Sequence, residues 1–304
     1  MRSDSHRERC GQRRRRAHGN RVGWFALIAV LPLLTGCFSL TVQPRALVIQ
    51  PNGAIRAMLL DCASSLPPHA APSTAAALDP SAIRMATWNI HKEGDTGWQN
   101  DLDALSRTSY VVLLQEVTLH PAVRDLLRTV DLQWVMASSF TFDENDIGVL
   151  TASRIAPVAS CTQRAVEPIL RLPKSAVLTW FGLAGSTQSL AVVNVHAINF
   201  SLSVDSYEEQ MRAIGDVLAK HQGPIIFAGD FNTWSAARTR VMKEVADRLG
   251  LKEIEFAEDK RTLFFGKQLD HILVRGLSVV RASAISVTSS DHNAVTATLR
   301  LIPG

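Results

Sequence analysis

Polar side chains that can bind metal ions or move protons recur where apolar segments of this chain end. Each alone could close a turn or cap a helix, but six such positions are difficult to explain in that way. In proteins built on sheets, functional sites assemble at strand ends and in the loops that follow them. We therefore expect one site, built from Asn89, Glu116, His196, Asp230 with Asn232, Asp270, and Asp291 with His292.

The carboxylates and the amide at the first of these positions suit a magnesium site. Mg²⁺ takes oxygen ligands in proteins, commonly one or two carboxylates, and keeps several waters for a substrate phosphate. Glu116 and Asp291 are the acids expected nearest the metal, with Asn89 beside them. We expect Mg²⁺ as the cofactor, with Mn²⁺ as the alternative.

The histidines add acid–base chemistry to this set. A histidine can activate water near neutral pH because its pKa lies there, and a carboxylate can orient the ring and stabilise its charged form. His292 and Asp270 are the candidates for such a pair. Attack on a phosphodiester also needs charge neutralised on the phosphoryl oxygens, which Asn232 and His196 could supply. The residues together favour hydrolysis of a phosphate ester.

Apolar strands and a few amphipathic helices fill the intervals between these positions. The run at 110–115 has the length of a buried strand, and 224–228 leads directly into Gly229-Asp230-Phe231-Asn232. This alternation predicts an α/β or α+β fold with large sheets. The expected strands are 83–90, 110–115, 190–195, 224–228, 272–274, 279–287 and 294–299, and the expected helices are 98–107 and 205–220.

Six short motifs follow one another along the chain: Thr87-Trp88-Asn89-Ile90, Leu114-Gln115-Glu116, Val195-His196, Gly229-Asp230-Phe231-Asn232, Leu269-Asp270-His271 and Ser290-Asp291-His292. In this order they resemble the endonuclease/exonuclease/phosphatase, or DNase I-like, superfamily, over residues 82–301. The stretch 167–172 and the stretch from Val193 through 199–202 to Trp234 look like the YafD-like bacterial branch of that superfamily.

The resemblance implies a four-layered sandwich, in which two mixed β-sheets are flanked by helices and the site lies at one edge. It implies Glu116 as the principal metal ligand, with Asn89 nearby. It also implies that His292 is the base next to the scissile phosphate and that Asp270 supports it.

Three further roles follow from the same resemblance. Asp230 would orient the nucleophile or a second metal, Asn232 would bind phosphate, and His196 would act as an acid or as a phosphate ligand. A histidine in that place resembles the DNase I, sphingomyelinase and inositol-phosphatase branches more than the abasic-site endonucleases.

One motif departs from the family pattern. An Arg-Glu-Pro triplet of DNase I-like relatives reads Val166-Glu167-Pro168 here, so its phosphate-contacting arginine is missing or is replaced by Arg164 or Arg171. Arg171 and Lys174 are the basic candidates for contact with a substrate phosphate. The departure weighs against DNA as the substrate. Specificity in the superfamily lies in loops, which we expect here at 139–147, 200–206 and 256–268.

Residues 1–36 are typical of a signal peptide of the lipoprotein type. An arginine-rich start precedes the apolar run from Val22 to Leu34, and thirteen residues are too few to span a bilayer. Leu34-Thr35-Gly36-Cys37 resembles a bacterial lipobox, in which the cysteine is lipidated and becomes the mature N-terminus. The alternative is an uncleaved anchor that continues to Val42. We expect an exported protein, anchored by lipid at Cys37 in the bacterial cell envelope and facing the periplasm.

The body of the chain differs from this leader in charge. Removal of residues 1–36, with their eight arginines and two acids, leaves 24 basic and 26 acidic residues and a net charge of −2. Such a body lacks the broad basic surface of a protein that holds duplex DNA. Residues 37–80 are expected to be an extension with a Pro- and Ala-rich linker, and residues 81–304 the catalytic domain. Cys62 and Cys161 could pair after export or remain two buried thiols.

Three functions fit these observations. The first is a metal-dependent phosphodiesterase acting on nucleic acid or on a phospholipid headgroup, with Mg²⁺ on Glu116 and water activated near His292. The second is a phosphomonoesterase for a small sugar or inositol phosphate, with a narrower pocket. The third is a non-catalytic envelope protein that retains the fold. All six motifs are intact, which favours an enzyme, and no obligate protein partner is evident.

Overall fold

The computed structural model describes residues 39–43, 47–51, 55–57, 62, 76–201 and 203–303. The expected signal peptide 1–36, the lipidation site Cys37 and most of the expected linker lie outside the described residues. The chain from Ser39 onward forms one compact unit. None of the helices in the described ranges has the length and apolar character that a membrane span requires.

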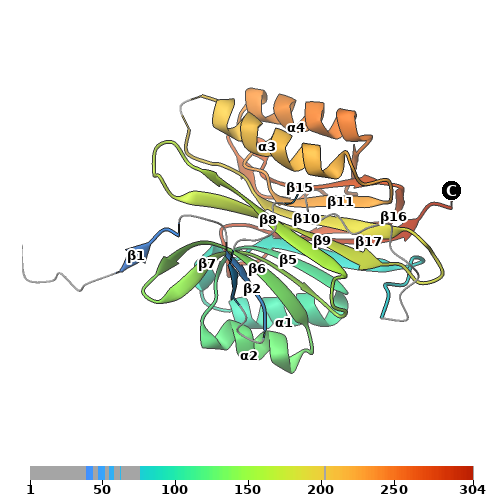
Figure 1. Cartoon of the computed structure of the whole chain (residues 1–304), viewed down its shortest axis with the longest axis horizontal. Coiled ribbons are helices and arrows are strands. Elements are labelled where there is room, and N and C mark those ends of the chain that lie inside the picture. The colour runs from blue at the N-terminus through green and yellow to red at the C-terminus, as the bar shows by residue number, and fades with distance from the viewer. Residues whose placement is uncertain are drawn as a thin grey trace, which may run out of the picture. The chain divides into compact units, whose positions relative to one another are not determined.

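The larger of two mixed sheets has nine strands (Figure 1). They are β1 (Leu40–Thr41), β2 (Leu47–Ile49), β3 (Ile55–Ala57), β4 (Ile83–Asn89), β5 (Val111–Thr118), β6 (Gln133–Phe142), β7 (Asn145–Ser153), β16 (Leu277–Ile285) and β17 (Ala294–Leu301). Their order across the sheet is β16-β17-β4-β5-β7-β6-β2-β3, with β1 paired to β6. Only β4 and β5 among them run parallel within the described pairs. Their parallel course brings both carboxyl ends to one edge.

The smaller sheet has six strands and also contains one parallel pair. It consists of β8 (Ala159–Val166), β9 (Pro173–Gly182), β10 (Ser189–His196), β11 (Ile225–Asp230), β12 (Lys252–Glu253) and β15 (Asp270–Arg275). The order is β12-β15-β11-β10-β9-β8, and β10 and β11 are the parallel pair. A separate hairpin is formed by β13 (Leu263–Phe264) and β14 (Lys267–Gln268).

Helices cover the outer face of each sheet (Figure 1). Helices α1 (Trp98–Thr108) and α2 (Pro121–Thr129) pack on the larger sheet, and α3 (Asp205–Leu218) and α4 (Ala236–Leu249) pack on the smaller one. A third apolar cluster fills the space between the sheets, because β4, β5, β10 and β11 bury side chains on both faces. The four-layered sandwich expected from the sequence is thereby confirmed.

The expected strands and both expected helices are present, with small differences at their ends. The expectation of a loop over 139–147 is wrong. β6 and β7 run through this stretch, and only Asp143 and Glu144, both at positive φ, form the turn between them. The expected loop at 256–268 contains the β13–β14 hairpin.

The described parts of 37–80 pack against the rest of the unit. β2 pairs with β6, and Leu78 is buried and bridges to Leu183. Cys62 and Cys161 form a disulfide, which settles the two alternatives that the sequence left open.

Candidate active site

Strand register places three of the expected site residues in one row. His196 at the end of β10 is paired with Asp230 at the end of β11, and Asp230 is paired in turn with Asp270 at the start of β15. On the facing sheet, Asn89 ends β4 and is paired with Gln115 of β5. The site therefore forms where the carboxyl ends of two parallel strand pairs meet.

A pocket of about 460 Å³ opens at this edge. Seven of the eight residues expected at strand ends line it: Asn89, Glu116, His196, Asp230, Asn232, Asp291 and His292. The eighth, Asp270, lies behind His292. The sequence argument for a single site is thus matched by a single cavity.

Gly229 permits the close approach that aligns β10 with β11. Its φ is 137°, and a Cβ built on it would lie 2.1 Å from the carbonyl oxygen of Val195. A side chain here would push the two strands apart, because no real contact is that short. The glycine of the Gly-Asp-Phe-Asn motif thus fixes the distance between His196 and Asp230.

Glu116 reaches the pocket through an irregularity in β5. The register with β7 shifts between Leu114 and Val117, and Glu116 has a φ of 53° inside the strand. A bulge of this kind redirects one side chain without ending the strand. The Glu116 carboxylate contacts the ammonium group of Lys92 and lies 3.6 Å from that of Lys174.

These cations decide the charge state of Glu116. Burial would raise the pKa of its carboxyl group, but His196, Lys174 and Lys92 outweigh burial and hold it well below its usual range. Glu116 is therefore an anion at neutral pH, as a ligand for a cation must be.

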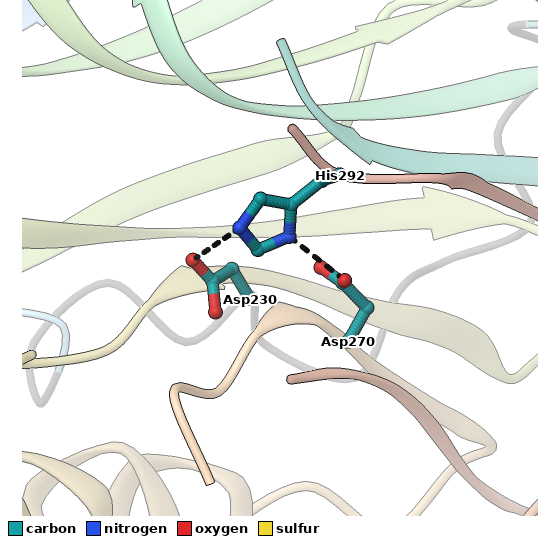
Figure 2. Close-up of side chains that lie close together, drawn as sticks. All are labelled: Asp230, Asp270 and His292. Atoms are coloured by element: carbon teal, nitrogen blue, oxygen red, sulfur yellow. Dashed lines mark hydrogen bonds and ion pairs between the residues drawn. The ribbon is translucent and has the colours of Figure 1, made fainter. Parts of the chain in front are cut away.

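His292 lies between two buried aspartates, as Figure 2 shows. Its Nδ1 is 2.8 Å from Oδ2 of Asp270, and its Nε2 is 4.0 Å from Oδ2 of Asp230. Burial lowers the pKa of His292, but the charges of Asp270 and Asp230 prevail and raise it to about 10. The two aspartates strongly favour the imidazolium form of the His292 ring.

The backbone around His292 is fixed by neighbouring motifs. Ser290 Oγ donates to the carbonyl oxygen of Asn89 and accepts from the amide of His292. Trp88 Nε1 donates to the carbonyl oxygen of His292 at 2.9 Å. The Thr-Trp-Asn and Ser-Asp-His motifs, about 200 residues apart, therefore hold one another in place.

His196 has the opposite character. Burial and the nearby ammonium group of Lys174 lower its pKa to about 4, although Asp230 and Glu116 act against them. Lys174 Nζ donates to His196 Nε2 at 2.8 Å. The ring is therefore neutral at neutral pH.

Two asparagines connect the halves of the site through Asp230. Asn89 Nδ2 donates to Oδ2 of Asp230 at 3.1 Å, and the backbone amide of Asn232 donates to Oδ1 of Asp230 at 2.9 Å. Asn232 has a φ of 49° and also donates to the carbonyl oxygen of Ala197. Both side chains are buried, so their orientation is set before any substrate enters.

The four remaining expected residues differ in their positions. Asp291 lines the pocket, but its side chain is 60% exposed and lies 3.9 Å from His91. Lys174 reaches the site through His196 and Glu116. Arg171 is exposed in the turn between β8 and β9 and does not line the pocket. Cys37 lies outside the described residues.

A left-handed turn beside the pocket contributes residues that the sequence argument did not select. His91, Lys92 and Glu93 form η1 (His91–Glu93) with φ of 52°, 56° and 55°. Each such residue costs roughly 1–2 kcal/mol. The turn is held by the Asn89 side chain, which accepts from the His91 backbone amide, and by the Glu93 carboxyl group, which accepts from the Thr118 backbone amide. Strain of this kind is invisible in a sequence pattern.

Two buried charged residues hold the loop that follows β10. Glu167 accepts from the amides of Asn199 and Phe200 at 2.7 and 3.2 Å. Arg238 of α4 donates to the carbonyl oxygens of Ile198 and Asn199 and stacks on Trp234. The glutamate of the altered Val-Glu-Pro triplet thus shapes one wall of the pocket.

The described residues contain a group that could hold a metal ion. One ligand atom each from Asp230, Asp270 and His292 lie within 4.8 Å of one another. Oδ1 of the buried Asp270 has no hydrogen-bond partner among the described residues. Asn89, Glu116 and Asp230 line the same pocket, and the oxygen donors of these side chains are of the type that a hard divalent cation takes.

Comparisons with known proteins agree with this geometry. A model of the Endonuclease/Exonuclease/phosphatase family matches residues 86–292. A UPF0294 protein of Yersinia pseudotuberculosis is 41% identical over 214 residues, which make up 69% of this chain and 81% of the relative.

Solved structures share the fold at low sequence identity. The human Nocturnin catalytic domain with bound sulfate has a TM-score of 0.57 at 18% identity, covering 74% of this chain and 96% of its own. The mannosyl-6-phosphatase of Bacteroides thetaiotaomicron has a TM-score of 0.57 at 16% identity, covering 71% and 99%. With its family match and its close relatives, the chain belongs to the endonuclease/exonuclease/phosphatase family.

Proposed function

We propose that this chain is a divalent-metal-dependent phosphodiesterase of the YafD-like branch. The observation that carries the proposal is the buried His292–Asp270 pair, with its 2.8 Å contact, at the wall of a pocket that also holds Glu116 and Asn89. A proton acceptor, an orienting carboxylate and oxygen ligands in one cavity are what hydrolysis of a phosphate ester needs.

His292 would exchange a proton with the attacking water. Asp270 orients the ring through Nδ1 and stabilises the imidazolium form that proton transfer produces. Because the aspartates raise the pKa of His292 to about 10, the ring accepts a proton from water at neutral pH only when positive charge offsets these carboxylates. The proposed activity should therefore depend on a cation.

Asn89 and Glu116 would hold that cation, for which we propose Mg²⁺, with Mn²⁺ as the alternative and Asp291 as a further ligand. When bound, it would neutralise charge on the phosphoryl and leaving oxygens. Asn232 and Lys174 would bind the non-bridging oxygens of the phosphate. The assignment of Lys174 is supported by its contacts with His196 and Glu116, both of which line the pocket.

We further propose that the protein is exported and lipid-anchored through Cys37 on the periplasmic side of the cell envelope. The disulfide between Cys62 and Cys161 supports export, because disulfides persist in oxidising compartments.

The experiment that tests the proposal compares a diester with a monoester. The purified protein is assayed on bis(p-nitrophenyl) phosphate and on p-nitrophenyl phosphate with Mg²⁺ present, and Mg²⁺ binding is measured by calorimetry. We expect turnover of the diester, and we expect Glu116→Gln to weaken Mg²⁺ binding while the exposed Glu255→Gln does not. Turnover of the monoester alone would replace the proposal with a phosphomonoesterase.

A further inference from the structure

Exposed apolar side chains are concentrated around the mouth of the pocket. Six of the fifteen large apolar side chains exposed among the described residues form what we call the apolar rim: Ile169, Leu170, Phe200, Leu263, Phe264 and Phe265. Four of these six line the pocket itself, together with Trp234. Exposed apolar side chains gathered at one pocket of a folded protein mark an interaction site.

The β13–β14 hairpin presents the most exposed part of the rim. Leu263 pairs with Gln268 and Phe264 with Lys267, so Phe265 and Gly266 form a two-residue turn with φ of 48° and 74°. Such turns favour Asn-Gly, and a bulky residue at positive φ is strained. Phe265 is nevertheless there, with 78% of its surface exposed. Its ring packs on that of Phe264, with centroids 4.4 Å apart, but both rings stay exposed, as insertion into an apolar phase requires.

The start of the described chain lies at the same edge of the sheets. Leu40 in β1 pairs with Phe142 at the end of β6, beside the turn that leads into β7, and Ile147 of β7 pairs with Thr118, two residues after Glu116 (Figure 1). Leu40 follows Cys37 by three positions in the chain, a separation of at most about 11 Å. A lipid on Cys37 would therefore keep this edge, and not the opposite one, close to a bilayer.

We propose that the apolar rim inserts into a lipid bilayer and that the substrate is a phosphodiester in the headgroup of a membrane phospholipid. This inference rests on the proposed function. Water would add to phosphorus, one of the two ester P–O bonds would break, and the departing oxygen would leave with a proton as an alcohol.

A lipid fits these observations better than a nucleic acid does. Single-stranded nucleic acid also stacks on aromatic rings, but its binding needs a basic groove along the backbone. Here the rim includes the aliphatic Ile169, Leu170 and Leu263, and the chain after residue 36 carries a net charge of −2. The cations near the pocket, Lys92 and Lys174, both lie against Glu116, so these two mark one phosphate position and not a basic groove along a backbone.

The test separates the rim from the lipid anchor and from the chemistry. The chain starting at Ser39 is used, because it comprises the whole compact unit and lacks Cys37. Phe264→Ser with Phe265→Asn removes the hairpin tip, and the asparagine suits the turn, so folding is preserved. Val279→Ser with Val280→Ser is the matched control, because both valines are exposed but lie at the opposite end of the strands, level with the start of β4 across β17.

Each protein is floated with vesicles of phosphatidylethanolamine and phosphatidylglycerol and assayed on those vesicles, on bis(p-nitrophenyl) phosphate and on a single-stranded DNA oligonucleotide. We expect the hairpin variant to lose about tenfold or more in vesicle binding and in lipid hydrolysis, a larger loss than on the soluble diester. The valine variant should match the wild type in every assay.

Three results would count against the inference. If the wild type does not float with vesicles, or if the hairpin variant floats equally well, the rim is not a membrane surface. If oligonucleotide hydrolysis alone falls in the hairpin variant, the rim stacks nucleobases and the lipid assignment is wrong. If vesicle binding depends on the hairpin but no phosphodiester is turned over, the proposed function and the substrate fail while the docking surface stands.

Discussion

The wild-type protein should lose stability as pH rises, because of Glu93, and Glu93→Gln should abolish that loss. Burial raises the pKa of the Glu93 carboxyl group from its ordinary 4.5 to about 8, although the Thr118 amide acts against burial. The folded protein therefore retains this proton over a range in which the unfolded chain releases it. Stability contributed by the group is complete below pH 4.5 and is lost as pH rises to about 8.

The size of the effect follows from the shift. One pKa unit is worth 1.36 kcal/mol, so the difference in unfolding free energy between Glu93→Gln and wild type should grow with pH by about 5 kcal/mol at most. Only 2% of the Glu93 side chain is exposed, so solvent screening reduces this little. Glu93 also holds the left-handed turn that places Lys92 against Glu116. The pH dependence of unfolding therefore tests the geometry of the site.

Urea unfolding at a series of pH values from 5 to 9 measures the difference. Glu253→Gln serves as the control, because Arg261 and His271 outweigh burial and lower the pKa of Glu253 to about 2. Its pH-dependent contribution is lost only below pH 4.5, so its difference from wild type should stay constant over the same range. A Glu93→Gln difference that is equally constant would refute a buried, protonated Glu93.

Two further substitutions test the geometry of the site. Gly229→Ala should destabilise the protein by about 3 kcal/mol or more in thermal unfolding, because its Cβ would meet the Val195 carbonyl oxygen. Gly185→Ala is also at positive φ, but its added Cβ would have nothing within 4 Å, so it should cost about 1 kcal/mol. Equal costs would show that β10 and β11 are not as close as described. Asp270→Asn should lower turnover by about 10²–10⁴-fold with little change in the Michaelis constant, since it leaves the shape of the pair but removes the charge that stabilises protonated His292. A loss of less than threefold would rule out the pair as the proton acceptor.

The layered fold and most of the site could be predicted because both depend on short-range patterns. Apolar runs of strand length end at Asn89, His196 and Asp230, and parallel pairing of such strands brings their ends together. Helix α4 was missed, although Val241, Val245 and Leu249 have helical spacing and are buried against the smaller sheet.

Other features depend on the tertiary structure itself. The hairpin of β6 and β7 was taken for a loop because polar residues such as Ser138 and Ser139 are buried there, which obscures the alternation expected of a strand. Lys92 enters the site only because three successive residues adopt a left-handed turn. Arg238 resembles a surface residue of a helix in the sequence, but it is buried under the loop that it holds.

Metal-dependent turnover and its loss in a single variant test the central claim most directly. The chain is assayed on bis(p-nitrophenyl) phosphate with Mg²⁺ and with EDTA, alongside His292→Ala, whose folding is verified by thermal unfolding. We predict turnover with Mg²⁺, none with EDTA, and none in folded His292→Ala. The His292–Asp270 pair is buried, whereas another imidazole–carboxylate pair at the pocket, His91 with Asp95 at 2.9 Å, is exposed. Wild-type turnover in His292→Ala, or turnover unaffected by EDTA, would contradict the account.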